Sequence, residues 1–358
     1  MKRVAILGTQ GVPAKYGGFE TLVENIIGDN CSKGVEYTVF CSKKDYKEWN
    51  NTYKGVKLKY IPLFHANGAQ STPYDILSML CTLRGYDTVV ILGVSGCIFL
   101  PIYRLFFRKR LVINIDGLEH RRAKWGKFAK WFLRTSEAMA VRFADVVISD
   151  NKGIQDYVKE TYGKDSALIA YGGDHVMRDV NLDAQERILN EYGLSSGDYS
   201  ISVCRIEPEN NSHVILEAFT DVPDQNLVFI GNWGRSEYSR ALRDKYQDKK
   251  NIVMLESVYD LDILYALRRN CKQYIHGHSA GGTNPSLVEA MHFGKPILAY
   301  DVVYNRETTE NNAYYFKTKE DITMLLQYKS DFSGEPMSEI ARRRYCWKYI
   351  AEQYEALY

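Results

Sequence analysis

Short apolar runs alternate with longer amphipathic segments along the chain. In the first half these runs cover residues 4–8, 37–40, 88–93, 110–116 and 145–150, and they are rich in Val, Ile and Leu. Apolar runs of this length are typical of strands that are buried on both faces, and the segments between them have helical periodicity. The pattern therefore predicts βαβ units and a parallel sheet.

The same pattern starts again after the Gly172-Gly173 pair. Its apolar runs cover residues 199–206, 226–231, 251–255, 272–277 and 295–301. Two complete series of strands and helices predict two doubly wound, Rossmann-like α/β domains. Ligands of such sheets bind beyond the carboxyl ends of the strands, so we expect a site in a cleft between the two domains.

The length of the chain agrees with this division, because 358 residues correspond to about two domains of ordinary size. We expect the first domain to cover residues 1–172 and the second to cover 173–337. Residues 338–358 have a long helical pattern. We expect this last segment to form a helix that packs back on the first domain.

Residues 88–107 are twenty residues long, about the length of a membrane span. Glycines, Pro101 and Arg104 interrupt this stretch, so we interpret it as a buried strand followed by a helix. The start of the chain has no apolar segment with a cleavage site, and no signal peptide is expected.

The seven cysteines are widely spaced and include no C-x-x-C pair. They are Cys31, Cys41, Cys81, Cys97, Cys204, Cys271 and Cys346. Their spacing argues against a disulfide framework and against a zinc site. A protein of the reducing cytosol fits this usage.

The net charge of +2 hides a difference between the two halves. Residues 1–172 contain 25 Lys and Arg against 16 Asp and Glu, a net charge of +9, whereas residues 173–358 contain 21 against 28, a net charge of −7. Such asymmetry indicates that the first half contacts an anionic surface.

The first candidate for chemistry is the glycine-rich segment GTQGVPAKYGGFET at 8–21. It leaves the first predicted strand and enters a helical pattern, where Gly17 and Gly18 allow backbone N–H groups to approach a sugar or an anion. The spacing matches neither G-x-G-x-x-G nor a Walker motif. A tight turn without a ligand is the alternative.

The second candidate is NIDGLEHRRAKWGKFAKWFLR at 114–134, which begins at the end of a predicted strand. We expect Asp116, Glu119 and His120 at the edge of the cleft, where a carboxylate orients a sugar hydroxyl or accepts its proton. A helix N-cap is the alternative role for Asp116.

Basic and aromatic residues interleave in the rest of this segment. They are Arg121, Arg122, Lys124, Lys127, Lys130 and Arg134, with Trp125, Phe128, Trp131 and Phe132. A basic helix with large aromatic side chains is typical of an element on a membrane surface. The alternative is a core-facing aromatic stripe with a solvated basic face.

The third candidate is VCRIEPENNSHVILEAF at 203–219, where Arg205 ends a strand and a helix begins near Ser212. An arginine beside a helix N-terminus is well placed to hold a phosphate with two hydrogen bonds. A structural ion pair of Arg205 with Glu207 or Glu209 is the alternative.

The fourth candidate is HGHSAGGTNPSLVEAMHFGKPILAYD at 276–301. Gly281 and Gly282 expose backbone amides, Thr283 or Asn284 is suited to cap the following helix, and Glu289 lies one turn inside it. This arrangement suits a phosphate together with ribose hydroxyls. The two histidines at 276 and 278 have no third ligand nearby, so no metal site is expected.

These residues resemble a known family. The segments R-I-E-P-E-N at 205–210 and G-G-T-N-P-S-L-V-E-A-M at 281–291 resemble the donor-binding half of the retaining glycosyltransferases of family 4, which have the GT-B fold. The N-terminal segments at 8–21 and 114–125 resemble the bacterial rhamnosyltransferases that build capsules, O-antigens and cell-wall polysaccharides. The resemblance spans nearly the whole chain.

The resemblance implies roles for residues of the second half. Arg205 is expected to hold the nucleotide diphosphate, whereas Asn210 stands where the family has a lysine that also contacts it. Glu289 matches the second member of the family's Glu-x7-Glu motif and is expected on the ribose.

Gly281 replaces the first Glu of that motif, so the amides of Gly282, Thr283 and Asn284 are the expected contacts to the donor sugar. Residues 258–264 resemble the stretch that borders the nucleobase. In the first half, the family often places a histidine near the sugar, whereas this chain offers Asp116 and Glu119 as catalytic residues.

The resemblance implies a metal-independent, retaining hexosyltransferase. We expect it to transfer L-rhamnose from dTDP-β-L-rhamnose to a lipid-pyrophosphate-linked saccharide in the synthesis of a bacterial surface polysaccharide. The nucleotide sugar is a co-substrate, and no further cofactor is expected. The protein is expected in the cytoplasm, in peripheral contact with the anionic inner face of the cell membrane and without a nucleic-acid partner.

Three alternatives stay open from the sequence. In the first alternative, the protein is a transferase whose donor is a UDP-sugar or a GDP-sugar. In the second alternative, it is a nucleotide-sugar epimerase of the same two-domain architecture. In the third, it binds a sugar nucleotide or a lipid without catalysis.

Overall fold

The computed structural model describes residues 1–15, 17–28, 34–122, 125–328 and 333–358. The chain divides into two compact units, Met1–Tyr171 with Trp347–Tyr358 and Gly172–Cys346. Tyr16 of the glycine-rich segment, Cys31 and Lys124 lie outside the described residues.

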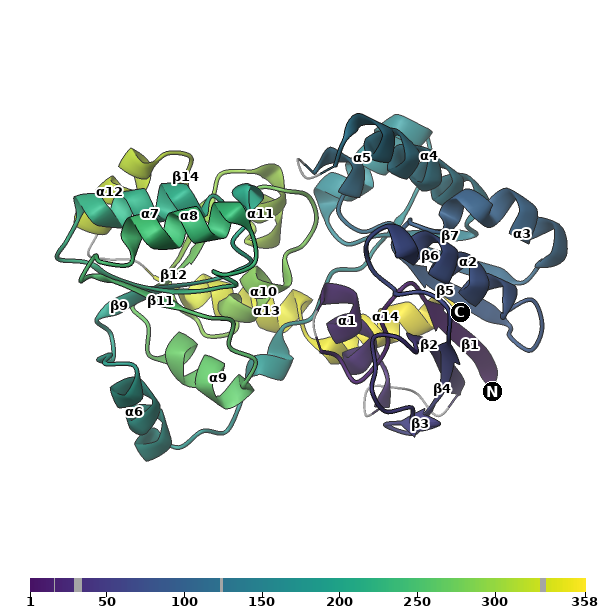
Figure 1. Ribbon diagram of the computed structural model, residues 1–358, viewed down its shortest axis with the longest axis horizontal. Coiled ribbons are helices and arrows are strands. Elements are labelled where there is room, and N and C mark those ends of the chain that lie inside the picture. Colours follow the sequence, from purple (N-terminus) through teal and green to yellow (C-terminus); the bar gives the residue numbers. More distant parts are fainter. Residues whose placement is uncertain (16, 29–33, 123–124, 329–332) are drawn as a thin grey trace. The chain divides into compact units, whose positions relative to one another are not determined.

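The sheet of the first unit has eight strands in the order β3-β4-β2-β1-β5-β6-β7-β8 (Figure 1). Neighbouring strands are parallel except for β3 and β4. The strands are β1 Lys2–Leu7, β2 Val35–Ser42, β3 Thr52–Tyr53, β4 Val56–Ile61, β5 Thr88–Leu92, β6 Arg110–Asn114, β7 Val146–Ser149 and β8 Ala167–Leu168. The chain winds outward from β1 in both directions, so the switch point of this sheet lies at the carboxyl ends of β1 and β5.

Helices connect the strands of the first unit. They are α1 Gly18–Ile26, α2 Ser71–Leu80, α3 Leu100–Phe106, α4 Lys127–Phe143 and α5 Lys152–Tyr162, and the C-terminal α14 Trp347–Ala356 joins them. α14 packs against α1 and buries Trp347, Ile350 and Tyr354. The end of the chain is therefore part of the core of the first unit.

The sheet of the second unit has six parallel strands in the order β11-β10-β9-β12-β13-β14. They are β9 Tyr199–Val203, β10 Asn226–Ile230, β11 Ile252–Leu255, β12 Gln273–His276, β13 Ile297–Tyr300 and β14 Tyr314–Phe316. The chain moves outward from β9 to β11 and then returns to β12 on the other side. The switch point of this sheet therefore lies at the carboxyl ends of β9 and β12.

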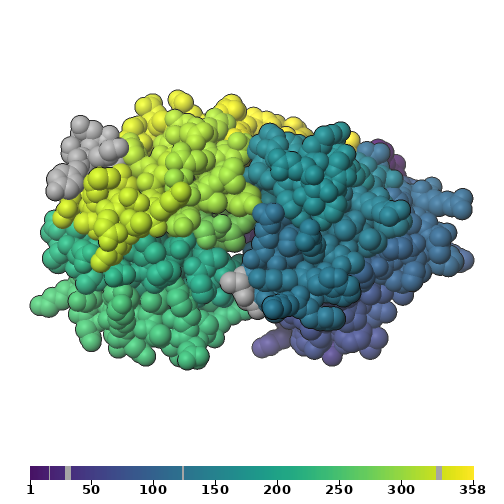
Figure 2. Space-filling model, turned by 90° about the horizontal axis from the view of Figure 1, so that it is seen from above, coloured from purple at the N-terminus to yellow at the C-terminus, as the bar shows by residue number. Residues whose placement is uncertain are grey.

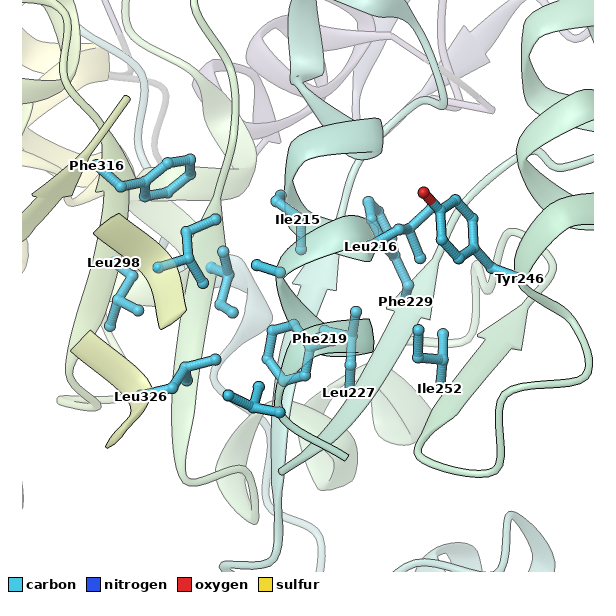
Figure 3. Close-up of a cluster of buried hydrophobic side chains, with 14 of the residues drawn as sticks. Ile215, Leu216, Phe219, Leu227, Phe229, Tyr246, Ile252, Leu298, Phe316 and Leu326 are labelled. Atoms are coloured by element: carbon cyan, nitrogen blue, oxygen red, sulfur yellow. The ribbon is translucent and has the colours of Figure 1, made fainter. Parts of the chain in front are cut away.

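The helices of the second unit are α6 Leu182–Glu191, α7 Ser212–Asp221, α8 Glu237–Tyr246, α9 Leu261–Arg269, α10 Pro285–Met291, α11 Val303–Thr308, α12 Lys319–Tyr328 and α13 Glu335–Arg344. Side chains of α7 and α12 pack on the sheet and form a buried apolar cluster (Figure 3). Trp233, Phe219, Phe229 and Phe316 are its largest fully buried members. This packing fixes the loops that follow the strands.

The ten apolar runs that predicted strands are confirmed as β1, β2, β5, β6, β7 and β9–β13. The stretch 88–107 is confirmed as a strand followed by a helix, β5 and α3. Two expectations differ from the structure. The basic segment 121–134 is not one helix, because α4 begins only at Lys127, after Gly126.

The C-terminal segment 338–358 is also not one helix. α13 ends at Arg344, and Tyr345 leaves the helical region with φ −123° and ψ 37°. α13 buries Met337 and Ile340 in the second unit, whereas α14 lies in the first unit. The chain therefore passes from one unit to the other at Cys346, nine residues later than the expected boundary after 337.

Candidate functional site

The loops that follow β9 and β12 meet at the switch point of the second sheet. The carbonyl oxygen of Glu209 accepts hydrogen bonds from the backbone N–H and the hydroxyl of Ser279, at 2.8 and 2.9 Å. The side-chain amide of Asn211 donates to the carbonyl oxygen of Gly277 at 2.8 Å. A Cβ atom on Gly277 would lie 2.1 Å from the carbonyl oxygen of Asn210, so this close approach requires glycine.

Asn210 joins these two loops with its side chain. Its amide nitrogen donates to the carbonyl oxygen of Arg205 at 2.7 Å, and its Oδ1 lies 2.6 Å from Nδ1 of His278. Since Oδ1 can only accept, the imidazole must donate from Nδ1. Asn210 was predicted as a donor-binding residue, and the structure gives its buried side chain two partners within the protein.

Arg205 is the second residue after β9, at the same switch point. Its side chain is half-buried, and α7 begins at Ser212, after the short helical turn Pro208–Asn210. Within the described part of the chain, the structure records no ion pair of Arg205 with Glu207 or Glu209. Arg205 and the start of α7 thus belong to the same segment after β9, where the guanidinium and the first N–H groups of the helix are both suited to an anion.

The glycine-rich loop after β12 leads into α10. Oδ1 of Asn284 accepts from the backbone N–H and the hydroxyl of Ser286, at 3.0 and 2.7 Å, so Asn284 is the N-cap. Gly282 has a φ of +92°, a conformation that residues other than glycine rarely adopt. Gly281 and the buried Thr283 belong to the same loop. The structure thus brings the predicted residues 281–284 to the switch point that Arg205 occupies.

Glu289 is held by the guanidinium of Arg268 and the imidazole of His175, two groups that the sequence did not predict. Its Oε2 lies 2.6 Å from a terminal guanidinium nitrogen of Arg268 on α9, and its Oε1 lies 3.6 Å from Nε2 of His175. The Arg268 side chain is 3% exposed, and its Nε and Nη1 are buried without a hydrogen-bond partner among the described residues. Burial lowers the pKa of His175 below its usual value. The pairing fixes the direction of the Glu289 carboxylate.

Two carboxylates of α1 hold the glycine-rich loop of the first unit. Oε1 of Glu20 accepts from the backbone N–H of Gln10 at 2.7 Å, and Glu24 accepts from that of Ala14. Burial raises the pKa of Glu20 above its usual value. Gly17 has a φ of 124°, and a Cβ atom there would lie 2.0 Å from Oε2 of Glu20. A loop lined by carboxylates suits neutral sugar hydroxyls better than a phosphate.

Asp116 and Glu119 follow β6 in the first unit. Asp116 has a φ of 61°, and its backbone N–H donates to Oδ1 of Asn114 at 3.0 Å. Non-glycine residues with such a φ are concentrated at functional sites, although Asp adopts it more readily than most. Asp116 does not cap α4, whose N-cap is Gly126.

Both carboxylate oxygens of Glu119 have partners within the loop. Oε1 accepts from Nε1 of Trp125 at 3.0 Å, and Oε2 lies 2.9 Å from Nε of Arg122. These bonds tie together the loop that carries Asp116. The catalytic assignments of Asp116 and Glu119 stay predictions.

A buried carboxylate of α4 contacts this loop through His120. Glu137 of α4 is buried, and its Oε2 lies 3.0 Å from Nδ1 of His120. The hydroxyls of Tyr157 and Tyr162 both donate to its Oε1 at 2.8 Å. Burial works to raise the pKa of Glu137, but the three hydrogen bonds outweigh it and lower that pKa. The cluster fixes the ring of His120 next to the predicted site residues.

The described residues offer neither a metal site nor a membrane-spanning helix. Nowhere among them do three or more His, Cys, Asp or Glu side chains gather as ligands for a metal ion. None of the helices formed by these residues combines the length and the apolar character that a membrane span needs.

Two family models match the chain. Residues 1–174 match the model described as "Domain of unknown function (DUF1972)". Residues 185–339 match the model described as "Glycosyl transferases group 1". No curated protein matches the chain in sequence. The boundary between the two matched segments agrees with the division into two units.

Solved structures are similar to the chain over its whole length. Sucrose-phosphate synthase from Thermosynechococcus elongatus is 15% identical, with a TM-score of 0.81 over 100% of this chain and 98% of that chain. HepE from Anabaena, solved with UDP-glucose, is 15% identical, with a TM-score of 0.76 over 100% and 99%. A Listeria monocytogenes protein provisionally described as a UDP-N-acetylglucosamine 2-epimerase is 17% identical, with a TM-score of 0.64 over 99% and 95%.

These likenesses concern the fold. The two parallel-sheet α/β units match GT-B glycosyltransferase structures, so the expected GT-B fold is confirmed. The glycosyl transferases group 1 domain lies in the second unit, where it includes Arg205, Asn210 and Glu289.

Proposed function

We propose that the protein is a glycosyltransferase that takes a sugar from a nucleoside diphosphate and transfers it to a saccharide acceptor. The glycosyl transferases group 1 domain and the GT-B fold support a glycosyltransferase. The proposed donor is dTDP-β-L-rhamnose, and the proposed acceptor is a saccharide linked to a lipid pyrophosphate in the synthesis of a bacterial surface polysaccharide. The reaction would then take place at the inner face of the cell membrane.

One observation supports the proposed position of the donor site. Arg205 lies at the switch point of the second sheet, and its guanidinium has no ion-pair partner among the described residues. Glu289, the other charged residue of the proposed site, is paired with Arg268 and His175 and keeps further acceptor capacity on its carboxylate. A half-buried cation beside a helix N-terminus and a glycine-rich loop suits a diphosphate. HepE, whose solved structures contain UDP and UDP-glucose, has the same fold.

Each part of the site has a role in this proposal. Arg205 and the free amides at the start of α7 stabilise the negative charge that grows on the diphosphate as its bond to the sugar breaks. The amides of 281–284 orient the diphosphate and the sugar, and Glu289 accepts hydrogen bonds from the ribose. If the configuration of the sugar is retained, the leaving diphosphate takes the proton of the acceptor hydroxyl.

The first experiment measures thermal stabilisation by dTDP, UDP, GDP, their sugars and NAD, with the native chain and two variants. A ligand that binds only the folded protein increases the free energy of unfolding, by about 2.7 kcal/mol at 100 times its Kd, and so raises the unfolding midpoint. We expect dTDP and dTDP-rhamnose to raise the midpoint of the native chain. A shift with UDP or GDP species alone would contradict the proposed dTDP-rhamnose donor but would still agree with a glycosyltransferase.

The variant Arg205→Ala removes the proposed diphosphate contact. We expect its affinity for the nucleotide to fall by about ten-fold to a hundred-fold, since a hydrogen bond to a charged group is worth about 1.5–3 kcal/mol. Arg187→Ala is the matched control, because Arg187 is exposed on α6. Equal nucleotide affinity in all three proteins would show that Arg205 does not contribute to nucleotide binding.

An epimerase is the second candidate, because the Listeria monocytogenes protein has the same fold. The two functions differ in what they need. A transferase releases nucleoside diphosphate only when an acceptor is present, whereas an epimerase converts the donor alone. Incubation of the donor with and without a lipid-linked saccharide, followed by chromatography of the nucleotides, separates them.

A further inference from the structure

α3 presents apolar side chains to solvent, in contrast to the strand that precedes it. β5 is buried along its whole length, but three of the seven residues of α3 are large, apolar and more than half exposed. They are Ile102 at 53%, Leu105 at 69% and Phe106 at 70%. Neighbouring exposed apolar residues of this size mark an interaction surface rather than ordinary surface variation.

α4 adds two aromatic side chains to this surface. Phe128 is 77% exposed and Trp131 is 62% exposed, and their ring centroids lie 5.8 Å apart. α3 and α4 contact each other, and Nε of Arg104 on α3 donates to the carbonyl oxygen of Phe143 at the end of α4 at 2.9 Å. Figure 2 looks onto the blue to teal surface of the first unit, the colours of these two helices. We call the exposed side chains of both helices the α3–α4 surface.

The charge around these residues is strongly positive. Residues 100–143 contain eleven Lys and Arg against three Asp and Glu, a net charge of +8. Glu137 is buried, and Glu119 is paired with Arg122, so two of the three acids leave little negative charge at the surface. Arg104 is paired with Asp145, but the structure records no ion pair of Lys127, Lys130 or Arg134 with a described residue. The surface therefore combines exposed apolar side chains with unpaired basic ones from α4.

We propose that the α3–α4 surface docks on an anionic lipid bilayer, with the apolar side chains in the interface and Lys and Arg on the lipid headgroups. Burying a large apolar side chain is favourable, and each basic residue near an anionic bilayer adds to the attraction. Phe and Trp are side chains that settle at the depth of the headgroups. The docking would bring the first unit to the lipid-linked acceptor, so its purpose rests on the proposed function.

The same observations argue against two other occupants. A second copy of the chain would place the exposed basic side chains of α4, which are Lys127, Arg134 and Arg142, against the same side chains of its partner, and like charges repel. A nucleic acid would match the charge, but the aliphatic side chains of Ile102 and Leu105 offer it neither stacking nor a hydrogen bond.

Vesicle co-sedimentation tests the proposal without donor or acceptor. The full chain is mixed with vesicles of phosphatidylcholine alone or with 30% phosphatidylglycerol, in about 0.1 M and 0.5 M NaCl. We expect binding to the anionic vesicles only, and at least ten-fold less of it at the higher salt concentration, because salt screens surface charges. Binding that is equal on both vesicle types, or absent from both, would overturn the proposal.

Two double variants separate the contributions of the apolar and the basic side chains to vesicle binding. We expect Leu105→Ser/Phe106→Ser and Lys127→Glu/Lys130→Glu each to bind anionic vesicles at least ten-fold more weakly than the native chain. Their matched controls are Leu182→Ser/Met324→Ser and Lys249→Glu/Lys250→Glu, which change exposed residues of the second unit and should bind as the native chain does.

Two further readouts complete the test. Unchanged nucleotide stabilisation in the Leu105→Ser/Phe106→Ser variant would show that it folds and that its donor site is intact, so a failed donor site and a failed docking surface are told apart. Sedimentation velocity without vesicles measures the oligomeric state. A dimer of the native chain that Leu105→Ser/Phe106→Ser dissociates would overturn the proposal and assign the surface to a second copy.

Discussion

At the scale of single residues, Asp75 is a carboxyl group whose burial predicts a dependence of stability on pH. It lies in α2, where its carboxylate accepts a hydrogen bond from the hydroxyl of Ser95. Burial raises the pKa of Asp75 to about 7, although hydrogen bonds from Ser95 and Gly96 work in the opposite direction. The folded protein therefore holds this proton up to about pH 7, whereas the unfolded chain releases it near pH 4.

The sign of the effect follows from linkage. Between pH 4 and pH 7 the folded state binds more protons at Asp75 than the unfolded state, so the free energy of unfolding falls as the pH rises through this window. A difference of one in pKa corresponds to about 1.4 kcal/mol. We expect urea midpoints to fall from pH 5 to pH 8 in the native chain and to fall less in Asp75→Asn. Asp248→Asn, at an exposed position, is the control and should retain the native slope.

Local rules of sequence predicted some residues of the site, and long-range packing supplied the rest. The N-cap at Asn284 and the place of Arg205 at a strand end follow from residues within a few positions of each other. The pairing of Glu289 with Arg268 joins residues that lie 21 positions apart, on two helices whose contact only the sheet topology creates. No periodicity or motif marks such a partner.

At the scale of elements, the side chain of Asn210 strengthens the contact between the loops after β9 and β12, beside the hydrogen bonds of Ser279 and Asn211. Asn210→Ala would leave the carbonyl oxygen of Arg205 and Nδ1 of His278 without their partner. We expect a loss of about 1–3 kcal/mol in the free energy of unfolding, the cost of leaving buried polar groups unpaired. Nucleotide affinity should fall as well, because the two loops would no longer hold Arg205 and residues 281–284 in one arrangement.

Urea unfolding and nucleotide titration check the role of the Asn210 side chain. Asn190→Ala is the matched control, since Asn190 is exposed at the end of α6. Native stability together with native nucleotide affinity in Asn210→Ala would show that the loops keep their arrangement without this amide.

The elements that the sequence predicted are those buried on both faces. Apolar residues are continuous in VAIL of β1 and VVIL of β5, so these strands stand out from their surroundings. β9 and β12 include polar residues, but their small and aromatic side chains are buried as well. β4 was missed, because in VKLKYI polar and apolar residues alternate, as they do in a strand near the edge of a sheet. The break between α13 and α14 was missed because both helices are amphipathic and neither Gly nor Pro separates them.

At the scale of the whole molecule, the first unit is completed by the last residues of the chain. Tyr354 of α14 is fully buried, and its hydroxyl accepts a hydrogen bond from the side-chain amide of Asn114 on β6 at 2.8 Å. The hydroxyl of Tyr37 on β2 donates to that of Tyr358 at 3.2 Å. The stability of the first unit therefore depends on residues that follow the whole of the second unit.

This dependence predicts that Tyr354 variants act on one unit only. Tyr354→Ala opens a large cavity in the first unit, and we expect a loss of about 3–5 kcal/mol in its free energy of unfolding. Tyr354→Phe keeps the ring but leaves the amide of Asn114 without its acceptor, and a loss of about 1–3 kcal/mol is expected. Tyr349→Ala, at an exposed position of the same helix, should change stability by less than about 0.5 kcal/mol.

Differential scanning calorimetry with and without nucleotide distinguishes the units. If the donor site lies in the second unit, the nucleotide raises the transition of that unit directly, whereas Tyr354→Ala lowers the other transition. A Tyr354→Ala variant in which a single transition moves as a whole would show that the two units unfold together. In that case the crossing of the chain at Cys346 would couple their stabilities, and the loss at Tyr354 would be shared by the donor site.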